Sequence, residues 1–167
     1  MKITILASIA TGLLLSLPAS AASLSFPTGP VVLEVTGLIS NTNDTASADF
    51  DLAMLTALDN RVTTTSAPWY DGTHDFAGPL GSTLLDTVGA SGTMLRVTAL
   101  NDYVTEIPVS DFRDYRVVLA TSIDGKLLSV RDKGPIFIIY PFDENPELNN
   151  ETYYGRSAWQ VKSIEIY

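Results

Sequence analysis

Apolar residues along this chain come in short runs separated by turn-forming residues, which is typical of a protein built mainly from β-strands. Asp124-Gly125 is a two-residue hairpin turn between two such runs, and Asn101-Asp102 separates another pair. The continuously apolar run 136–140 predicts a buried strand. The expected strands cover residues 31–39, 61–66, 93–100, 103–109, 116–123, 126–130, 136–140 and 158–167.

Two or more short helices are expected to interrupt the strands. Asp51 is placed to cap a helix over 52–58, in which leucines recur on one face. A second helix is expected over 80–88, ended by Gly89. The pattern therefore predicts the α+β class, dominated by β. The remaining polar stretches are expected to be turns or loops, and the two longest are the first places to look for a site. These stretches are 41–48, 67–79 and 141–155.

The first residues of the chain have the pattern of a secretory signal. Lys2 is followed by an apolar stretch over 3–17, and small residues then lead to Ala21. This stretch is shorter than the roughly 20 apolar residues of a membrane span. We therefore expect cleavage after Ala21, no membrane span in what remains, and one domain over 22–167. The periplasm of a Gram-negative bacterium is the expected location, with outright secretion as the alternative.

Composition narrows the possible partners and chemistries. The formal net charge is −9, so nucleic acid and anionic lipid are not expected to bind. The chain contains no cysteine, which excludes disulfides, thiolate metal sites and cysteine nucleophiles. A fold without disulfides depends on packing, which a hydrophobic content of 46% can supply.

Three groups of polar residues are candidate metal or ligand sites. His74 is the only histidine, and Asp71 and Asp75 flank it, which is one pattern for a divalent-cation site; a solvated loop histidine is the alternative interpretation. The carboxylates of 143–147 lack the spacing of an EF-hand and are interpreted as solvated surface. In the segment 131–135, Arg131 and Lys133 stand beside a glycine, which suits a phosphate or carboxylate ligand; an ordinary charged turn is the alternative.

The two tryptophans are the remaining candidates. Trp69 and Trp159 both lie in or beside expected loops, where they are able to stack on a flat ligand. Packing in the core or at its rim is the alternative interpretation.

An ordered series of short motifs resembles the oxidoreductase molybdopterin-binding domain of the sulfite oxidase family, in particular its small exported members. The resemblance spans about residues 31–166. It implies an α+β fold with mixed sheets around a deep pocket, and a molybdenum held by a pterin and by one cysteine thiolate. The motifs are Val32-Leu33-Glu34-Val35-Thr36-Gly37, Phe50-Asp51-Leu52, Pro68-Trp69, Phe76-Ala77-Gly78-Pro79-Leu80, Leu84-Leu85, Ala99-Leu100-Asn101-Asp102-Tyr103, Ile107-Pro108, Asp124-Gly125, Lys133-Gly134-Pro135, Tyr140-Pro141 and Trp159-Gln160.

The family's cysteine has no counterpart here. Its place falls near Thr65-Ser66, so Ser66 is the available substitute, as an alkoxide that would need strong activation. The pterin also ends in a phosphate, which needs cationic or backbone N–H donors. The late cations of this chain are Arg131, Lys133, Arg156 and Lys162.

The resemblance implies a set of residues that line the cofactor pocket. Within it, Tyr103 is expected to donate a hydrogen bond to an oxo or carboxylate group, and Asp102 to orient Arg131. The alternative is that Asp102 and Tyr103 simply form a tight turn. We assign no catalytic residue and no metal ligand, and molybdopterin follows from the resemblance alone. The pocket residues are Ser66, Trp69, Asn101, Asp102, Tyr103, Arg131, Lys133 and Tyr140.

Three functions are compatible with these observations. The first is a non-enzymatic module that binds a small anionic or polar ligand in the former cofactor pocket, and presents that state to a membrane sensor or transporter. The second is a molybdopterin-dependent oxidoreductase with a metal shell that lacks cysteine. The third is an accessory or structural partner of an exported or membrane complex. Whether the chain is an enzyme is left open by the sequence.

Overall fold

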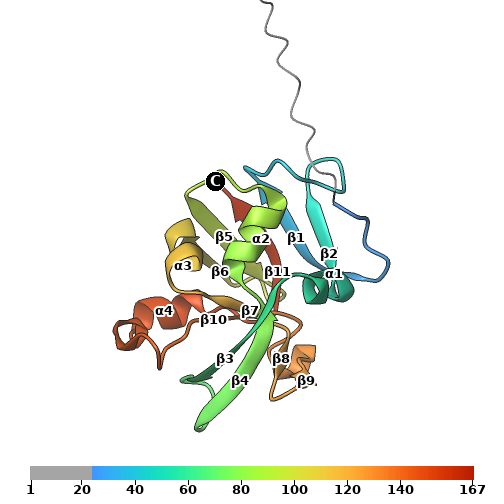
Figure 1. The fold of residues 1–167 in the computed structure, drawn as a ribbon. Helices are drawn as coiled ribbons and strands as arrows, with labels where there is room; N and C mark the ends of the chain where they lie inside the picture. Colours follow the sequence, from blue (N-terminus) through green and yellow to red (C-terminus); the bar gives the residue numbers. More distant parts are fainter. Residues whose placement is uncertain (1–23) are drawn as a thin grey trace, which may run out of the picture.

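The computed structural model describes residues 24–167, which form strands grouped in three sheets and a few short helices (Figure 1). The expected signal peptide lies outside the described residues. Within 24–167, no helix combines the length and apolar character that crossing a bilayer requires. The strands are β1 (Val31–Gly37), β2 (Ala48–Asp51), β3 (Asn60–Ser66), β4 (Thr73–Pro79), β5 (Met94–Ala99), β6 (Val104–Pro108), β7 (Val118–Ala120), β8 (Ser122–Ile123), β9 (Lys126–Leu127), β10 (Phe137–Ile139) and β11 (Val161–Ile166). The helices are α1 (Leu52–Ala57), α2 (Gly81–Val88), α3 (Val109–Asp114) and α4 (Glu151–Arg156), with 3₁₀ turns at Val130–Asp132 and Pro146–Leu148.

The largest sheet has five strands in the order β2-β1-β11-β5-β6. β11 pairs in parallel with β1 and antiparallel with β5, so the sheet is mixed. Val35 lies opposite Ile164, and Ile164 lies opposite Val97 on the next strand. All three side chains are fully buried, which places the main core against this sheet.

A second sheet has the order β3-β4-β8-β9 and projects from the lower part of the molecule in Figure 1. β3 and β4 pair over their full lengths, from Asn60 opposite Pro79 to Ser66 opposite Thr73. The prediction of a loop over 67–79 is therefore wrong for 73–79. Gly78 misled the sequence interpretation, although the strand needs it: a Cβ there would lie 2.1 Å from the carbonyl oxygen of Leu119.

The expected strand 116–123 is divided between two sheets. β7 pairs with β10, whereas β8 pairs with β4 and with β9. The hairpin at Asp124-Gly125 is confirmed: both residues have positive φ, at 49° and 75°, as a two-residue turn with left-handed central positions requires. The expected strand 126–130 is short, because the chain turns into a 3₁₀ helix at Val130.

The two predicted helices are confirmed. Asp51 Oδ1 accepts a hydrogen bond of 2.8 Å from the Met54 backbone N–H, which caps α1. Gly89 ends α2 in the left-handed region, at φ 62°. The sequence did not predict β2, α3 or α4. α4 lies inside the segment 141–155 that was expected to be a loop, and Asn150 caps it through a hydrogen bond from the Thr152 backbone N–H.

The fold class is α+β, mostly β, with mixed sheets and a few short helices, as the sequence predicted.

A candidate ligand pocket beside α4

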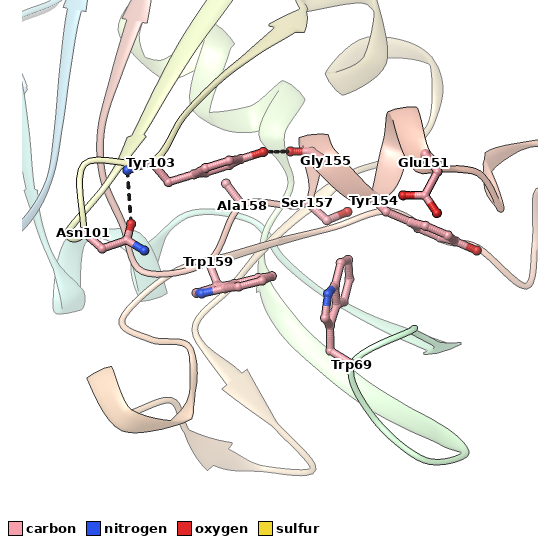
Figure 2. A pocket seen from close by; sticks show the side chains of 9 residues that line it. All are labelled: Trp69, Asn101, Tyr103, Glu151, Tyr154, Gly155, Ser157, Ala158 and Trp159. Atoms are coloured by element: carbon pink, nitrogen blue, oxygen red, sulfur yellow. Dashed lines mark hydrogen bonds between the residues drawn. The ribbon is translucent and has the colours of Figure 1, made fainter.

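A pocket of about 330 Å³ opens between α4, the loop after β3 and the turn between β5 and β6 (Figure 2). Its size is at the small end of the range for ligand sites in proteins. Aromatic side chains make up much of its wall, and the polar groups are few. The lining residues are Trp69, Asn101, Tyr103, Glu151, Tyr154, Gly155, Ser157, Ala158 and Trp159.

The Trp69 ring stands at a steep angle to two other aromatic rings of the pocket, those of Trp159 and Tyr154. The ring centroids of Trp69 and Trp159 are 5.7 Å apart at an interplanar angle of 70°. Those of Trp69 and Tyr154 are 6.2 Å apart at 79°. Perpendicular rings form a corner rather than a flat platform, so a ligand in this corner meets rings with different orientations.

The rings are held in place from behind by a buried phenylalanine. Phe137 on β10 is fully buried and lies 5.4 Å from Trp69 and 6.1 Å from Trp159, centroid to centroid. Lys133 places its Nζ atom over the Trp159 ring, 5.1 Å from the centroid, and over Tyr70 at 5.5 Å. The aromatic wall is thus fixed by contacts within the protein, which lowers the entropy lost when a ligand binds.

The turn between β5 and β6 closes the opposite side. Asn101 Oδ1 accepts a hydrogen bond of 3.1 Å from the Tyr103 backbone N–H, and the Tyr103 hydroxyl donates one of 2.9 Å to the Gly155 carbonyl (Figure 2). Asp102 at the tip adopts φ 63°. Tyr103 therefore ties the turn to α4 and leaves its ring in the pocket wall.

Glu151 carries the only formal charge among the residues that line this pocket. Its carboxylate takes part in none of the ion pairs between described residues. The Ser157 hydroxyl is already used, because it donates to the Tyr153 carbonyl at 2.9 Å. The pocket therefore offers one carboxylate and the Asn101 amide as its main polar groups.

The opposite side of α4 packs against a buried polar cluster. The Tyr140 hydroxyl donates to Asp111 Oδ2 at 2.8 Å, and Arg156 Nη1 donates to the same oxygen at 2.9 Å. Tyr140 is fully buried, and burial is the main reason why its pKa is raised far above the usual value, helped by the charge of Asp111. This cluster joins the residue after β10 to α3 and α4, and so fixes the helix that carries the pocket.

The structure brings three of the predicted pocket residues together: Trp69, Asn101 and Tyr103. Tyr140 lies behind α4 in the buried cluster, and Arg131 is exposed in a 3₁₀ turn. Asp102 pairs with Lys162 at 2.7 Å, so it does not orient Arg131. This hydrogen bond lowers the pKa of the Asp102 carboxyl. A role of the eight residues in cofactor binding stays a prediction.

Sequence reasoning missed the contribution of α4, which supplies Glu151, Tyr154 and Gly155 to the pocket. It did single out Trp159 as a stacking residue, without placing it beside Trp69. The capping residue Asn150 ahead of a tyrosine pair was the one available indication of a helix here.

His74, another polar candidate, is hydrogen-bonded to neighbouring residues of the protein. His74 Nδ1 lies 2.8 Å from Asp124 Oδ2, and its Nε2 lies 3.1 Å from the Asp71 carbonyl oxygen. The bond to Asp124 is the main reason why the pKa of His74 is raised. In residues 24–167, no group of three or more His, Asp or Glu side chains is placed to hold a metal ion.

The fold has relatives among solved structures. No protein-family model matches the chain, and no curated protein does. Thirty chains of known structure match it. One is the sulfane dehydrogenase SoxCD from Paracoccus pantotrophus, with a TM-score of 0.62 at 19% identity. The match covers 81% of this chain and 37% of the SoxCD chain, so the chain spans little more than a third of that protein. At this identity the similarity shows a shared fold.

The residue expected to replace the family's cysteine does not suit a metal. The Ser66 hydroxyl donates to Asp143 Oδ1 at 2.5 Å, and the Ser66 backbone N–H donates to Asp143 Oδ2 at 2.7 Å. A carboxylate beside a hydroxyl favours its protonated form and opposes the alkoxide that would be needed to bind molybdenum. Ser66 is also absent from the lining of the pocket.

The cationic groups do not form a phosphate site either. Lys133 lies over two aromatic rings, Arg156 pairs with Asp111, and Lys162 pairs with Asp102. A pterin phosphate would need several such donors at one place. The residues present therefore do not fit the molybdopterin cofactor that the sequence resemblance implies.

Proposed function

We propose that this chain is an exported, non-redox binding protein that holds a small polar ligand in the pocket beside α4. The observation that carries the proposal is the pocket itself. It combines fixed aromatic rings with a carboxylate that has no ion-pair partner among the described residues. A pre-formed concave site with few polar groups is the usual form of a ligand site.

The similarity to SoxCD supports a fold in common with a redox enzyme, and folds are often retained when the chemistry changes. The cysteine that would hold the metal is absent from the chain, and Ser66 is bonded to a carboxylate. Both facts favour a binding role over an oxidoreductase with an altered metal shell.

Of the two ligand types that the sequence left open, the pocket favours a polar ligand over an anionic one. Neither Lys nor Arg is among the residues that line it, and Glu151 contributes a negative charge. An anion placed beside that carboxylate would be repelled.

The N-terminal pattern of the sequence supports a periplasmic location, where the ligand-bound protein would be presented to a membrane sensor or transporter.

The decisive experiment is metal and pterin analysis of the mature protein purified from its native compartment. We expect neither molybdenum nor pterin in stoichiometric amount. Ser66→Ala is expected to leave ligand binding unchanged, since Ser66 does not line the pocket. One molybdenum per chain would overturn the proposal and favour the oxidoreductase.

A further inference from the structure

We infer that the pocket selects a small organic cation of the methylated ammonium class. This inference deepens the proposed binding function and depends on it. The argument has three parts: the arrangement of the rings, the sign of the charge in the pocket, and the way in which the protein already uses one of the rings.

The ring arrangement suits a cation. An aromatic ring carries negative potential on its faces, so several rings set at steep angles around one space attract a positive group from more than one direction. Trp69 makes angles of 70° and 79° with Trp159 and Tyr154. The Tyr103 ring lines the same space from the other side (Figure 2). A flat sugar or nucleobase would prefer one broad platform, which perpendicular rings do not supply.

The charge in the pocket has the sign that attracts a cation. Glu151 lies on α4 next to the aromatic corner, and no lysine or arginine lines the space. The whole chain has a formal net charge of −9, which favours the approach of cations in general. A carboxylate beside aromatic faces distinguishes this pocket from a merely apolar one.

The protein itself uses one of these rings in the same way. Lys133 Nζ lies 5.1 Å from the centroid of the Trp159 ring, without being part of the pocket lining. The Trp159 ring therefore already holds one ammonium group. Contacts to a bound cation would depend mainly on the rings of Trp69, Tyr103 and Tyr154.

The test compares choline with its neutral isostere, the alcohol in which a tert-butyl group replaces the trimethylammonium group. Binding to the full mature protein is followed by calorimetry and by tryptophan fluorescence. Because both compounds have the same shape, a difference between them reports the charge. We expect choline to bind at least about tenfold more tightly than the isostere.

Two matched pairs of variants locate the effect. Glu151→Gln should weaken choline binding about fivefold, as loss of a solvent-exposed ion pair does. Glu147→Gln, an exposed carboxylate outside the pocket, should change nothing. Tyr154→Leu should weaken binding about tenfold, whereas Tyr154→Phe keeps the ring and the affinity. Thermal unfolding of each variant shows whether it is folded.

Equal binding of choline and its isostere would overturn the inference and identify an apolar pocket. Binding of neither compound would overturn it as well, as would tight binding of small carboxylates in their place. None of these results requires molybdenum in the native protein. The failure of this inference is therefore distinguishable from the failure of the proposed function, which rests on metal and pterin analysis.

Discussion

Tyrosine and charged side chains lie on both sides of α4, but they are hydrogen-bonded to each other on one side and line an open pocket on the other. On the buried side, the Tyr140 hydroxyl and the Arg156 guanidinium both donate hydrogen bonds to Asp111. On the open side, the Tyr103 hydroxyl is bonded to the helix, but Glu151 and the ring of Tyr154 face the pocket. One short helix thus has a side whose polar groups are paired within the protein and a side that borders an open pocket.

This difference separates stability from binding within a few residues. A polar group whose partner is removed on the buried side keeps its desolvation cost and gains nothing in return. A group removed on the open side is replaced by water at little cost to the fold. Substitutions on the two sides are expected to differ both in size and in the property that they change.

The largest effect is expected from Asp111→Ala. The substitution leaves the buried Tyr140 hydroxyl and the Arg156 guanidinium without their shared acceptor, at a cost of about 3 kcal/mol of folding free energy. Urea denaturation gives this value from the midpoint at constant slope. Asp114→Ala, at an exposed position of the same helix, is the control and should change stability by less than about 0.5 kcal/mol. Similar values for the two variants would contradict the proposed importance of the cluster.

Tyr140→Phe is expected to cost less, about 2 kcal/mol, because it removes one neutral donor to a charged acceptor and leaves the Asp111–Arg156 pair in place. Equilibrium denaturation again provides the measurement. Ligand binding should be unchanged, since Tyr140 does not line the pocket. A variant that is fully stable but binds poorly would reverse the assignment of the two sides.

The stability of the wild-type protein at alkaline pH should show the contribution of the Tyr140 hydroxyl. The pKa of Tyr140 is raised above the ordinary value of 10.0, chiefly by burial. Its contribution to stability is therefore fully present below pH 10 and is lost as pH rises above that value, because the unfolded chain ionises first. The loss amounts to at most about 1.4 kcal/mol for each pH unit. Urea midpoints of the wild type should fall more steeply above pH 10 than those of Tyr140→Phe. Parallel curves would show that the hydroxyl is not shielded from water.

Tyr103→Phe is expected to have the smallest effect, about 0.5 kcal/mol, because its hydrogen bond to the Gly155 carbonyl is exposed to solvent. The ring stays in the pocket wall, so cation binding should persist. Comparing denaturation of this variant with that of Tyr140→Phe tests the contrast directly, since both lose one tyrosine hydroxyl. A cost as large as that of Tyr140→Phe would remove the distinction between the two sides.

Local patterns in the sequence were sufficient for the elements whose determinants are local. Asp51 capped a predicted helix, Gly89 ended another, and Asp124-Gly125 formed the predicted hairpin. Each of these depends on hydrogen bonds or backbone angles within a few residues. The α+β class followed from the same patterns.

Elements that depend on distant partners were missed. β4 forms because Asn60–Ser66 pairs with it along its whole length and because Gly78 lets β7 approach, neither of which is visible in 73–79 alone. α3 and α4 have six residues each, as α1 does, but neither has the recurring leucines that identified α1. For the same reason the pocket could only be predicted in part: Trp69, Asn101 and Tyr103 were named, but the helix that faces them was not.

The position of β11 has a consequence for the order in which this protein can fold. β11 lies between β1 and β5, so the five-stranded sheet has no centre until residues 161–166 are available. A chain synthesised from its N-terminus cannot complete that sheet while its early strands emerge from the ribosome. β1 and β5 therefore lack the neighbour that joins them until the last strand is available, and the main sheet forms only then.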